Sequence, residues 1–325
     1  MDLRVFIVKR LLLMLLTLFV LMTITFILFR VAPGDPVGSM ISASLNPGAR
    51  ESLMRSFGLD KPMYIQYLLY VRNLLRGDMG QSFYYRLPVT EVLRPKLLNT
   101  VILIGPATLL ALVVGVLMGA LTAARRGGKL DLITTVLSLA IKAVPPFWTS
   151  MIALVIFSYT LDWFPSAGLR SPGHAADGIL EKFLNPDFLH HLALPMTILT
   201  LHFLAQPLLT MRNSMLDVHG EDFVEMARAK GVGERRVIYH HWIRNALLPV
   251  VSIVPVMIGA VVGGQVLVET VFSWPGLGRE MVSAVNGSDY PVAQASFLMI
   301  GAVTIGMNFL ADIAYAVLDP RVGLE

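Results

Sequence analysis

Six long apolar runs are the feature of this sequence that most restricts its fold. Each is about 20 residues or longer, the length that an α-helix needs to cross the hydrocarbon core of a bilayer. Because lipid offers the backbone no hydrogen-bond partners, such runs are expected to be helical. The sequence therefore predicts an all-α integral membrane protein with six transmembrane helices, at Leu11–Phe29, Leu97–Ala123, Leu132–Leu161, Leu192–Met211, Ala246–Val268 and Val292–Leu318.

The shortage of charged residues supports this class. Only 15% of the 325 residues are charged and 55% are hydrophobic, whereas soluble domains carry about a quarter charged residues. The formal net charge is +4, but the basic residues lie beside the apolar runs, so the charge indicates membrane orientation rather than nucleic-acid binding. Cysteine is absent, which excludes disulfides, zinc–thiolate sites and iron–sulfur ligation by this chain.

Clusters of Lys and Arg set the predicted topology. They occur at the N-terminus, between the second and third runs, and between the fourth and fifth runs. Because short cytoplasmic loops are enriched in these residues, both termini are predicted to be cytoplasmic. We interpret the first run as an uncleaved signal anchor, with a removed signal peptide as the alternative. The chain then divides into a first helix at 1–30, an extracytoplasmic segment at 31–96 and a transmembrane core at 97–325.

Two long polar segments are predicted on the outer side. The first, 31–96, contains turn sequences at Pro33–Pro36 and Asn46–Gly48 and an amphipathic helix near Met63–Leu75. It forms either a small lid or a linker without fixed structure. The second, about 162–191, is rich in Pro, Gly and His.

The stretch Asp217–Pro249, called the polar segment below, carries acids and bases between two apolar runs. Its first half predicts a short amphipathic helix, with apolar Leu216, Phe223 and Met226 recurring at helical spacing. Gly231 and Gly233 end that helix and permit a sharp bend, and a second polar helix is predicted over 234–244. Two short helices joined by such a bend could be bound by a partner in the aqueous phase. The alternative is an amphipathic loop that rests on the lipid surface.

Sequence signatures of catalysis are absent. Gly128-Lys129 is followed by Leu130 and lacks the earlier glycine of a phosphate-binding loop. No GxSxG or HExxH motif occurs. The adjacent pairs His190-His191 and His240-His241 point about 100° apart on a helix, so we interpret them as solvated interfacial histidines and not as metal ligands.

Ionisable residues inside the runs are candidates for function because burying a charge in lipid is costly. Lys142 precedes Val144-Pro145-Pro146, where the helix is expected to kink. It either faces a water-filled translocation path or extends to the inner interface. Asp312 in the last run is expected to pair with a basic residue of a neighbouring helix. Arg30 and Glu269 lie near outer ends, where a gate or a structural ion pair is equally compatible with the sequence.

The stretch from Glu269 to Gly278 reads ETVFSWPGLG. Pro275 and Gly276 interrupt a helix, so a re-entrant turn at the outer face is predicted, with Phe272 and Trp274 in the interfacial aromatic belt. This stretch resembles the corresponding segment of the permease subunits of dipeptide and oligopeptide ABC importers. The resemblance extends over the whole chain through Arg30 with Pro33–Pro36, Asp222-Phe223, Ala227–Gly231, Arg244–Pro249, Asp289–Pro291 and Leu318–Arg321.

The resemblance implies the six-helix fold of a type I ABC importer permease, closest to the first of two paralogous permeases. It carries a small extracytoplasmic insertion after helix 1 and a cytoplasmic coupling helix at about 217–233. Met226 stands where the general coupling motif has alanine, and His241 and Arg244 replace its later Ile and Pro. The residues that the resemblance assigns to ATPase coupling are Asp222, Phe223, Glu225, Met226, Ala227, Arg228, Lys230 and Gly231.

The same resemblance implies the partners. These are a second homologous permease, two ATPase subunits that bind ATP and Mg, and an extracytoplasmic solute-binding protein, all at a bacterial inner membrane. The chain itself is expected to hold no cofactor or metal and to be no enzyme. It would carry a peptide solute by alternating access, with Lys142 as a candidate residue of the translocation path. The outer gate or binding-protein face is assigned to Glu269, Phe272, Trp274, Pro275 and Gly276.

Two other classes stay open on the residues alone. An ion-driven secondary transporter or channel would need intramembrane acids along a path, and this chain offers chiefly Asp312. A membrane-embedded enzyme would need a catalytic pair at membrane depth, and the sequence shows no such pair. The resemblance leaves the solute among dipeptides, oligopeptides, glutathione, nickel chelates and haem.

Overall fold

A computed structural model describes residues 3–31, 61–173, 183–233, 236–237, 242–263 and 265–318. Within these ranges the chain is helical and has no β-strand; one isolated bridge joins Gln81 and Pro88. The turn sequences at 33–36 and 46–48, the His240-His241 pair and the motif at 319–321 lie outside them. The elements are α1 (Leu3–Val31), α3 (Met63–Leu75), α4 (Val89–Ala124), α5 (Lys129–Ala143), α6 (Pro146–Ala153), the π-helix η1 (Leu154–Thr160), α8 (Pro186–His219), α9 (Asp222–Ala229), α11 (Ile243–Gly263), α12 (Val266–Val271), α13 (Leu277–Asn286) and α14 (Tyr290–Leu318).

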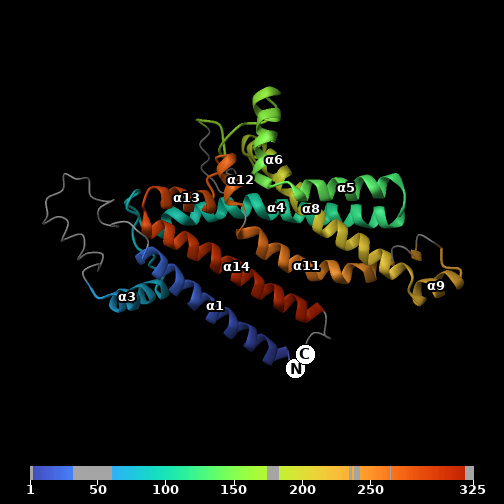
Figure 1. The fold of residues 1–325 in the computed structure, drawn as a ribbon, viewed down its shortest axis with the longest axis horizontal. Coiled ribbons are helices and arrows are strands. Elements are labelled where there is room, and N and C mark those ends of the chain that lie inside the picture. The colour runs from blue at the N-terminus through green and yellow to red at the C-terminus, as the bar shows by residue number, and fades with distance from the viewer. Residues whose placement is uncertain are drawn as a thin grey trace.

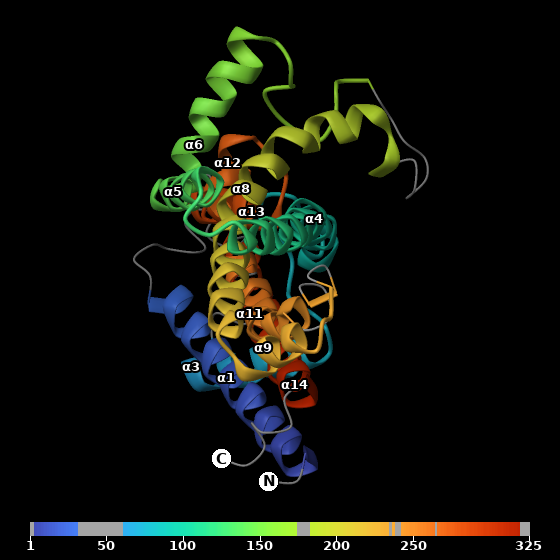
Figure 2. The same ribbon diagram turned by 90° about the vertical axis from the view of Figure 1, so that its right-hand side faces the viewer.

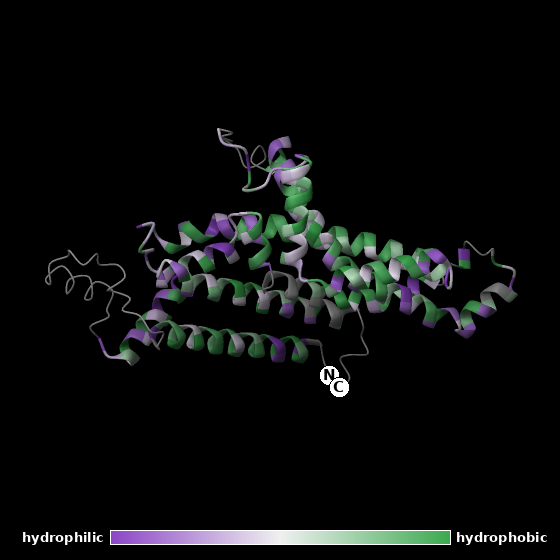
Figure 3. Ribbon diagram, turned by 45° about the horizontal axis from the view of Figure 1, so that its top comes forward, coloured by the Kyte–Doolittle hydropathy of each residue, from purple (hydrophilic) through white to green (hydrophobic). Residues whose placement is uncertain are grey.

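Four helices, α1, α4, α8 and α14, are long and apolar enough to cross a membrane. The pair formed by α5 with α6 and η1 gives a fifth candidate, and α11 contains a shorter apolar stretch, Ile243–Val254. Apolar residues follow the lengths of these helices, and polar residues gather near their ends (Figure 3). The all-helical, multi-pass class is confirmed, whereas the count of six spans stays a prediction.

The third apolar run is broken at the two prolines where the sequence predicted a kink, and the bend is sharper than a kink. The α5 axis and the axis of α6 with η1 differ by 100°, so α6 stands across the direction of α5 (Figures 1 and 2). Val144 ends α5 in an extended conformation, with φ −87° and ψ 137°. The cause is local, because the residue before a proline avoids the helical region and Pro145 and Pro146 both lack an N–H donor.

Helices α4 and α8 pack closely through two glycines of α4. A Cβ atom on Gly115 would lie 2.7 Å from Cγ of Pro207, and one on Gly119 would lie 2.4 Å from the carbonyl oxygen of Leu208. Small residues four apart let helix backbones approach closely in membranes, where lipid supplies little hydrophobic drive for helix association. The Gly115–Gly119 pair therefore fixes the position of α8, the helix that leads into the polar segment.

Two predictions about segments that contact the first helix are confirmed. Asp312 of α14 pairs with a neighbouring basic residue, Arg10 of α1, at 3.0 Å. The amphipathic helix predicted near Met63–Leu75 is α3. It lies along the end of α1, where the hydroxyls of Thr23 and Tyr67 are 2.7 Å apart.

Candidate functional site: the polar segment and its anchors

The polar segment folds as a short helix between two long ones. Helix α8 continues to His219 and ends at Gly220, and α9 occupies Asp222–Ala229 at the far end of the bundle from α13 (Figure 1). Gly231 follows α9 with φ +76°, a backbone conformation in which glycine is favoured over residues with a Cβ. The bend predicted at Gly231 is therefore confirmed.

Helix α9 is held on one side and open on another. Val224 is fully buried against Val237, with Val232 packed beside them. Phe223 and Met226 keep 38% and 55% of their surface exposed. Since residues three apart share a helix face and Val224 points elsewhere, the two exposed side chains form an apolar contact surface that nothing in the described chain covers.

The acidic and basic members of the assigned set whose side chains are described lie in the open. Asp222, Glu225, Lys230 and Gly231 are all exposed, and Lys230 N–H closes the last turn of α9 by donating to the Met226 carbonyl at 3.0 Å. The backbone of Ala227 and Arg228 is helical, but their side chains lie outside what the structure describes. The coupling roles of all eight assigned residues stay predictions.

One boundary of the polar segment was predicted wrongly. Leu216 belongs to α8 and not to the amphipathic helix with Phe223, because the break falls at Gly220. The second polar helix predicted over 234–244 lies largely outside the described residues.

The sequence reasoning missed an aromatic anchor, formed by His219 and Trp242 on either side of α9 in the chain. The rings of His219 and Trp242 stack with centroids 4.9 Å apart, and the indole N–H of Trp242 donates to the Met215 carbonyl. Met211, Met215 and Trp242 are buried together with Ala246 of α11. The anchor joins the end of α8 to the start of α11 across the polar segment. The signal was a tryptophan among charged residues, since a surface loop rarely needs so large an apolar side chain.

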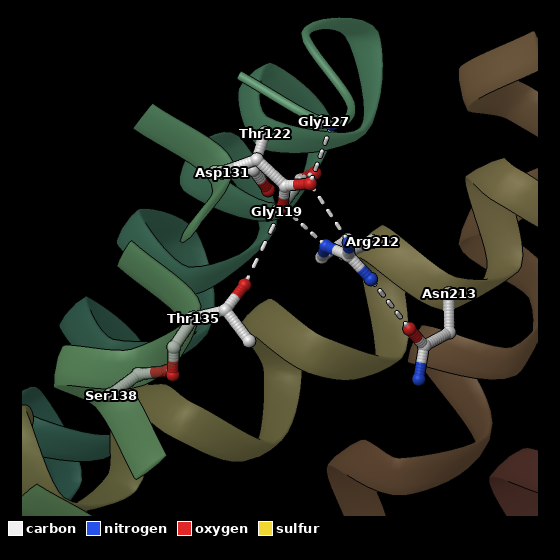
Figure 4. A network of polar contacts seen from close by, with 8 residues as sticks. All are labelled: Gly119, Thr122, Gly127, Asp131, Thr135, Ser138, Arg212 and Asn213. Carbon is white, nitrogen blue, oxygen red and sulfur yellow. Dashed lines mark hydrogen bonds and ion pairs between the residues drawn. The ribbon is translucent and has the colours of Figure 1, made fainter. Parts of the chain in front are cut away.

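A buried ion pair joins α5 to the same end of α8 (Figure 4). The guanidinium of Arg212 donates from Nε and Nη2 to the two carboxylate oxygens of Asp131, at 2.6 and 2.9 Å. Asp131 also accepts from the Gly127 N–H at 3.1 Å. Its side chain is 7% exposed. A bidentate pair has a defined geometry, so the α4–α5 turn and α8 are linked as one unit beside the polar segment.

The five residues assigned to an outer gate or binding-protein face lie together, with Glu269 in α12 and the other four in the turn that leads to α13. The Glu269 carboxylate is 1% exposed and accepts from Thr100 Oγ1 at 2.6 Å and from the Arg279 N–H at 2.9 Å. A Cβ on Gly276 would lie 2.2 Å from that carboxylate. Glu269 thus caps the first turn of α13, where free N–H groups favour an anion.

The aromatic-belt interpretation of Phe272 and Trp274 is wrong. They are 3% and 0% exposed, and the Trp274 indole N–H donates to the Asn99 carbonyl at 3.0 Å while the Asn99 amide donates to the Pro275 carbonyl at 2.9 Å. The tryptophan found a polar partner inside the protein, so it does not need the interface. A role of this turn in gating or docking stays a prediction, with Pro275 its one partly exposed member among the five.

Residues 82–85, which precede α4, are fixed to the end of the bundle that carries α12 and α13. Asp289 accepts from the Ser82 hydroxyl and from the Phe83 and Tyr84 N–H groups. The Tyr85 hydroxyl donates to Glu280 at 2.9 Å, and burial together with that carboxylate raises the pKa of Tyr85 to about 12. The phenol therefore stays protonated as a donor at neutral pH.

The remaining candidates are placed as follows. Lys142 is exposed at the end of α5, and its Nζ donates to Gln206 Oε1 of α8 at 2.9 Å. The guanidinium of Arg30 lies 5.5 Å from the ring centre of Phe26. His191 is 7% exposed, so its interpretation as a solvated histidine is wrong: its ring contacts the Asp187 carbonyl at 2.8 Å.

Comparison with known proteins identifies the family. Residues 112–324 match the family described as binding-protein-dependent transport system inner membrane component, and residues 3–103 match the N-terminal family of the same systems. The oligopeptide transport system permease protein AppB of Bacillus subtilis is 36% identical over 318 residues, covering 98% of each chain. The di/tripeptide transport system permease protein DppB of Pseudomonas aeruginosa is 37% identical and the dipeptide permease DppB of Escherichia coli 35%, each over 98% of both chains.

Both matches and all three relatives describe a membrane permease subunit and not an enzyme. The helical bundle, the open short helix α9 and the similarity over nearly the whole length agree, and the chain belongs to the family of inner-membrane permease components of binding-protein-dependent transport systems.

Proposed function

We propose that the protein is the transmembrane subunit of an ATP-driven importer of peptides, of the dipeptide and oligopeptide class. The named substrates of its relatives support the solute class. The observation that carries the mechanism is the exposed apolar surface of Phe223 and Met226 on a helix that is anchored from behind by Val224. Because the sequence contains no phosphate-binding loop, the energy must come from another subunit, and that subunit needs an exposed surface such as this one to bind.

Helix α9 is connected to the membrane-spanning helices in two ways. Behind α9, Val224 packs on Val237, and the Trp242 anchor joins α8 to α11. Beside it, Asp131 and Arg212 join α8 to α5. A push on α9 would therefore move α5, α8 and α11 together rather than bend one loop, which is the rigid-body movement that alternating access requires.

The full assembly in this proposal contains a second, similar permease, two ATPase subunits and an extracytoplasmic binding protein. ATP and Mg bind to the ATPase subunits. Each permease has six spans, with the polar segment and both termini in the cytoplasm of a bacterial cell, in agreement with the charge bias of the sequence. An ion-driven transporter working alone is disfavoured, because Asp312, the acid expected for an ion path, is paired with Arg10 at 3.0 Å.

The test uses the complete importer in proteoliposomes, with uptake of a labelled peptide and ATP hydrolysis measured in parallel. We expect Gly231→Asp and Glu225→Lys to lower peptide uptake per ATP hydrolysed while the subunits still co-purify. Glu225 is exposed on α9 and Gly231 is exposed at the bend that follows it, so neither change touches the buried Val224 side. Uptake by Gly231→Asp at the wild-type rate would contradict the coupling role. A wild-type chain that transports peptides without any ATPase subunit would contradict the importer assignment.

A further inference from the structure

A seam of polar contacts runs between the third and fourth transmembrane segments. In order from the end nearest α9, Arg212 pairs with Asp131, Gln206 accepts from Lys142, and His202 lies 2.7 Å from the Thr149 hydroxyl. As the residue number falls along α8 it rises along α5 and α6, as expected for antiparallel neighbours. The seam therefore follows α8 from its polar-segment end to the 100° break between α5 and α6.

Next to this seam, α8 has an exposed polar stripe made of His202, Gln206, Thr210, Asn213 and Asp217. At 3.6 residues per turn these five positions fall within about 80° of one another on the helix surface. Gln206, Asn213 and Asp217 are exposed, and His202 and Thr210 are partly exposed. The stripe covers the half of α8 that leads to α9, and His202 and Gln206 lie near the middle of this 34-residue helix.

Lipid is a poor environment for this stripe. Polar side chains at membrane depth face the protein interior or a water-filled cavity, because lipid leaves their hydrogen-bonding groups without partners. The break beside it adds to the argument. Pro145 is exposed, and the Lys142 carbonyl lacks its helical donor because Pro146 has no N–H. Irregular backbone at this depth is tolerated only when it is covered by protein or lines water.

Lys142 differs in its partner from three other basic residues of the bundle. Arg10, Lys96 and Arg212 are each bound to a carboxylate, whereas within the described ranges Lys142 has a neutral partner, Gln206. An ammonium group has three donors, so two remain for a further acceptor. A carboxylate is the acceptor that best compensates a cation at low dielectric, and an ordinary peptide has one at its C-terminus.

We propose that the α8 polar stripe lines the water-filled path of the solute, and that Lys142, positioned by Gln206, binds a carboxylate of the passing peptide. This inference rests on the peptide importer proposed above. It assigns the 100° break between α5 and α6 to the path, because Lys142 lies beside the break and contacts Gln206 of the stripe. Burial of the stripe against a second permease is the competing arrangement.

The first experiment measures access to water. Because the chain has no cysteine, single cysteines can be placed at Gln206 and Asn213 of the stripe, with Val136→Cys and Leu137→Cys as controls on α5. Both control side chains are 56% exposed in the isolated chain and are apolar. The assembled importer is treated in membranes with a charged, membrane-impermeant thiol reagent, and the mass of this chain is followed.

We expect the stripe cysteines to react at least about tenfold faster than the controls, since a charged reagent and the thiolate that attacks it both need water. Reaction of the stripe cysteines at the control rate would overturn the path assignment, whether lipid or the second permease covers them. Faster reaction in one nucleotide state than in the other would add that the path opens to one side at a time.

The second experiment tests the carboxylate. Trialanine uptake by the complete importer is compared for wild type, Lys142→Gln, Lys142→Arg and the control Lys129→Gln, which alters an exposed lysine at the start of α5. We expect Lys142→Gln to lower the initial rate about tenfold, the effect of one lost charge-assisted hydrogen bond. Lys142→Arg should restore most of the rate.

Uptake by Lys142→Gln at the wild-type rate would overturn the carboxylate contact. Equal losses in Lys142→Gln and Lys142→Arg would also overturn it, because a structural lysine and not a charge would then be required. A failure of the proposed function looks different: the wild-type importer would take up no trialanine with ATP, while the labelling pattern of the stripe would still decide the path.

Discussion

Replacement of Gly119 by alanine is the sharpest test of how the bundle is held together. The new Cβ would lie 2.4 Å from the Leu208 carbonyl oxygen and 2.9 Å from Cβ of Met211, where ordinary contacts begin at 3.4 Å. Because the nearest atom belongs to helical backbone, no side-chain rotation can relieve the clash. Helices α4 and α8 must separate by about 1 Å, a gap at which a dispersion contact has lost a quarter to a half of its depth.

The expected cost follows from that separation. Overpacking a close contact costs about 1–3 kcal/mol, and the backbone clash places Gly119→Ala toward the upper end. Replacing a helical glycine by alanine returns up to about 1 kcal/mol of helix propensity, so the net loss should be about 2 kcal/mol. At a few degrees per kcal/mol, the midpoint of thermal unfolding should fall by about 3–6 °C.

Gly105→Ala is the matched control, because it lies in the same helix and a Cβ there would meet nothing within 4 Å. Both variants gain the same helix propensity, so only Gly119→Ala should lose stability. The assay is the temperature at which the purified protein loses its helical circular dichroism in detergent, at one heating rate for all variants. Equal midpoints for the two variants would refute the close approach of α4 and α8.

Three shorter predictions concern the anchors of the site. Gly231→Ala should strain a backbone at φ +76° by about 1–2 kcal/mol and lower peptide uptake per ATP hydrolysed, whereas Gly233→Ala, equally open and not at positive φ, should retain the wild-type ratio. Asp131→Asn should lower the thermal midpoint by an amount equivalent to about 2 kcal/mol, because it removes the charge from hydrogen bonds that Arg212 donates. The exchange Asp131→Arg with Arg212→Asp should recover part of that loss; no recovery would mean that charge pairing is not what joins α5 to α8. Glu269→Ala leaves two buried donors without an acceptor, at about 1–3 kcal/mol for each, so tryptophan fluorescence should shift to longer wavelength, while Glu269→Gln, which keeps one acceptor oxygen, should shift it less.

What the sequence alone determined are features that depend on one segment and its solvent. The long apolar runs predicted helices because a helix satisfies its own backbone hydrogen bonds in lipid. The Met63–Leu75 helix followed from its own periodicity, and Gly231 marked a bend because few other residues adopt positive φ. The partner of Asp312 was predicted by type, since an intramembrane carboxylate needs a cation, although nothing in the sequence identified Arg10.

Only the tertiary structure decided the features that depend on what a second segment supplies. Trp274 reads as an interfacial residue by itself, but the Asn99 carbonyl on α4 gives its N–H a partner and allows full burial. Glu269 reads equally as a gate or a cap until the first turn of α13 is placed against it. The two prolines predicted a kink, but neither its 100° angle nor the contact of Lys142 with Gln206 could be read from the sequence, because both involve segments that lie apart in the chain or in direction. Local sequence fixes which conformations a segment can adopt, whereas hydrogen-bond partners and close contacts from distant segments select among them.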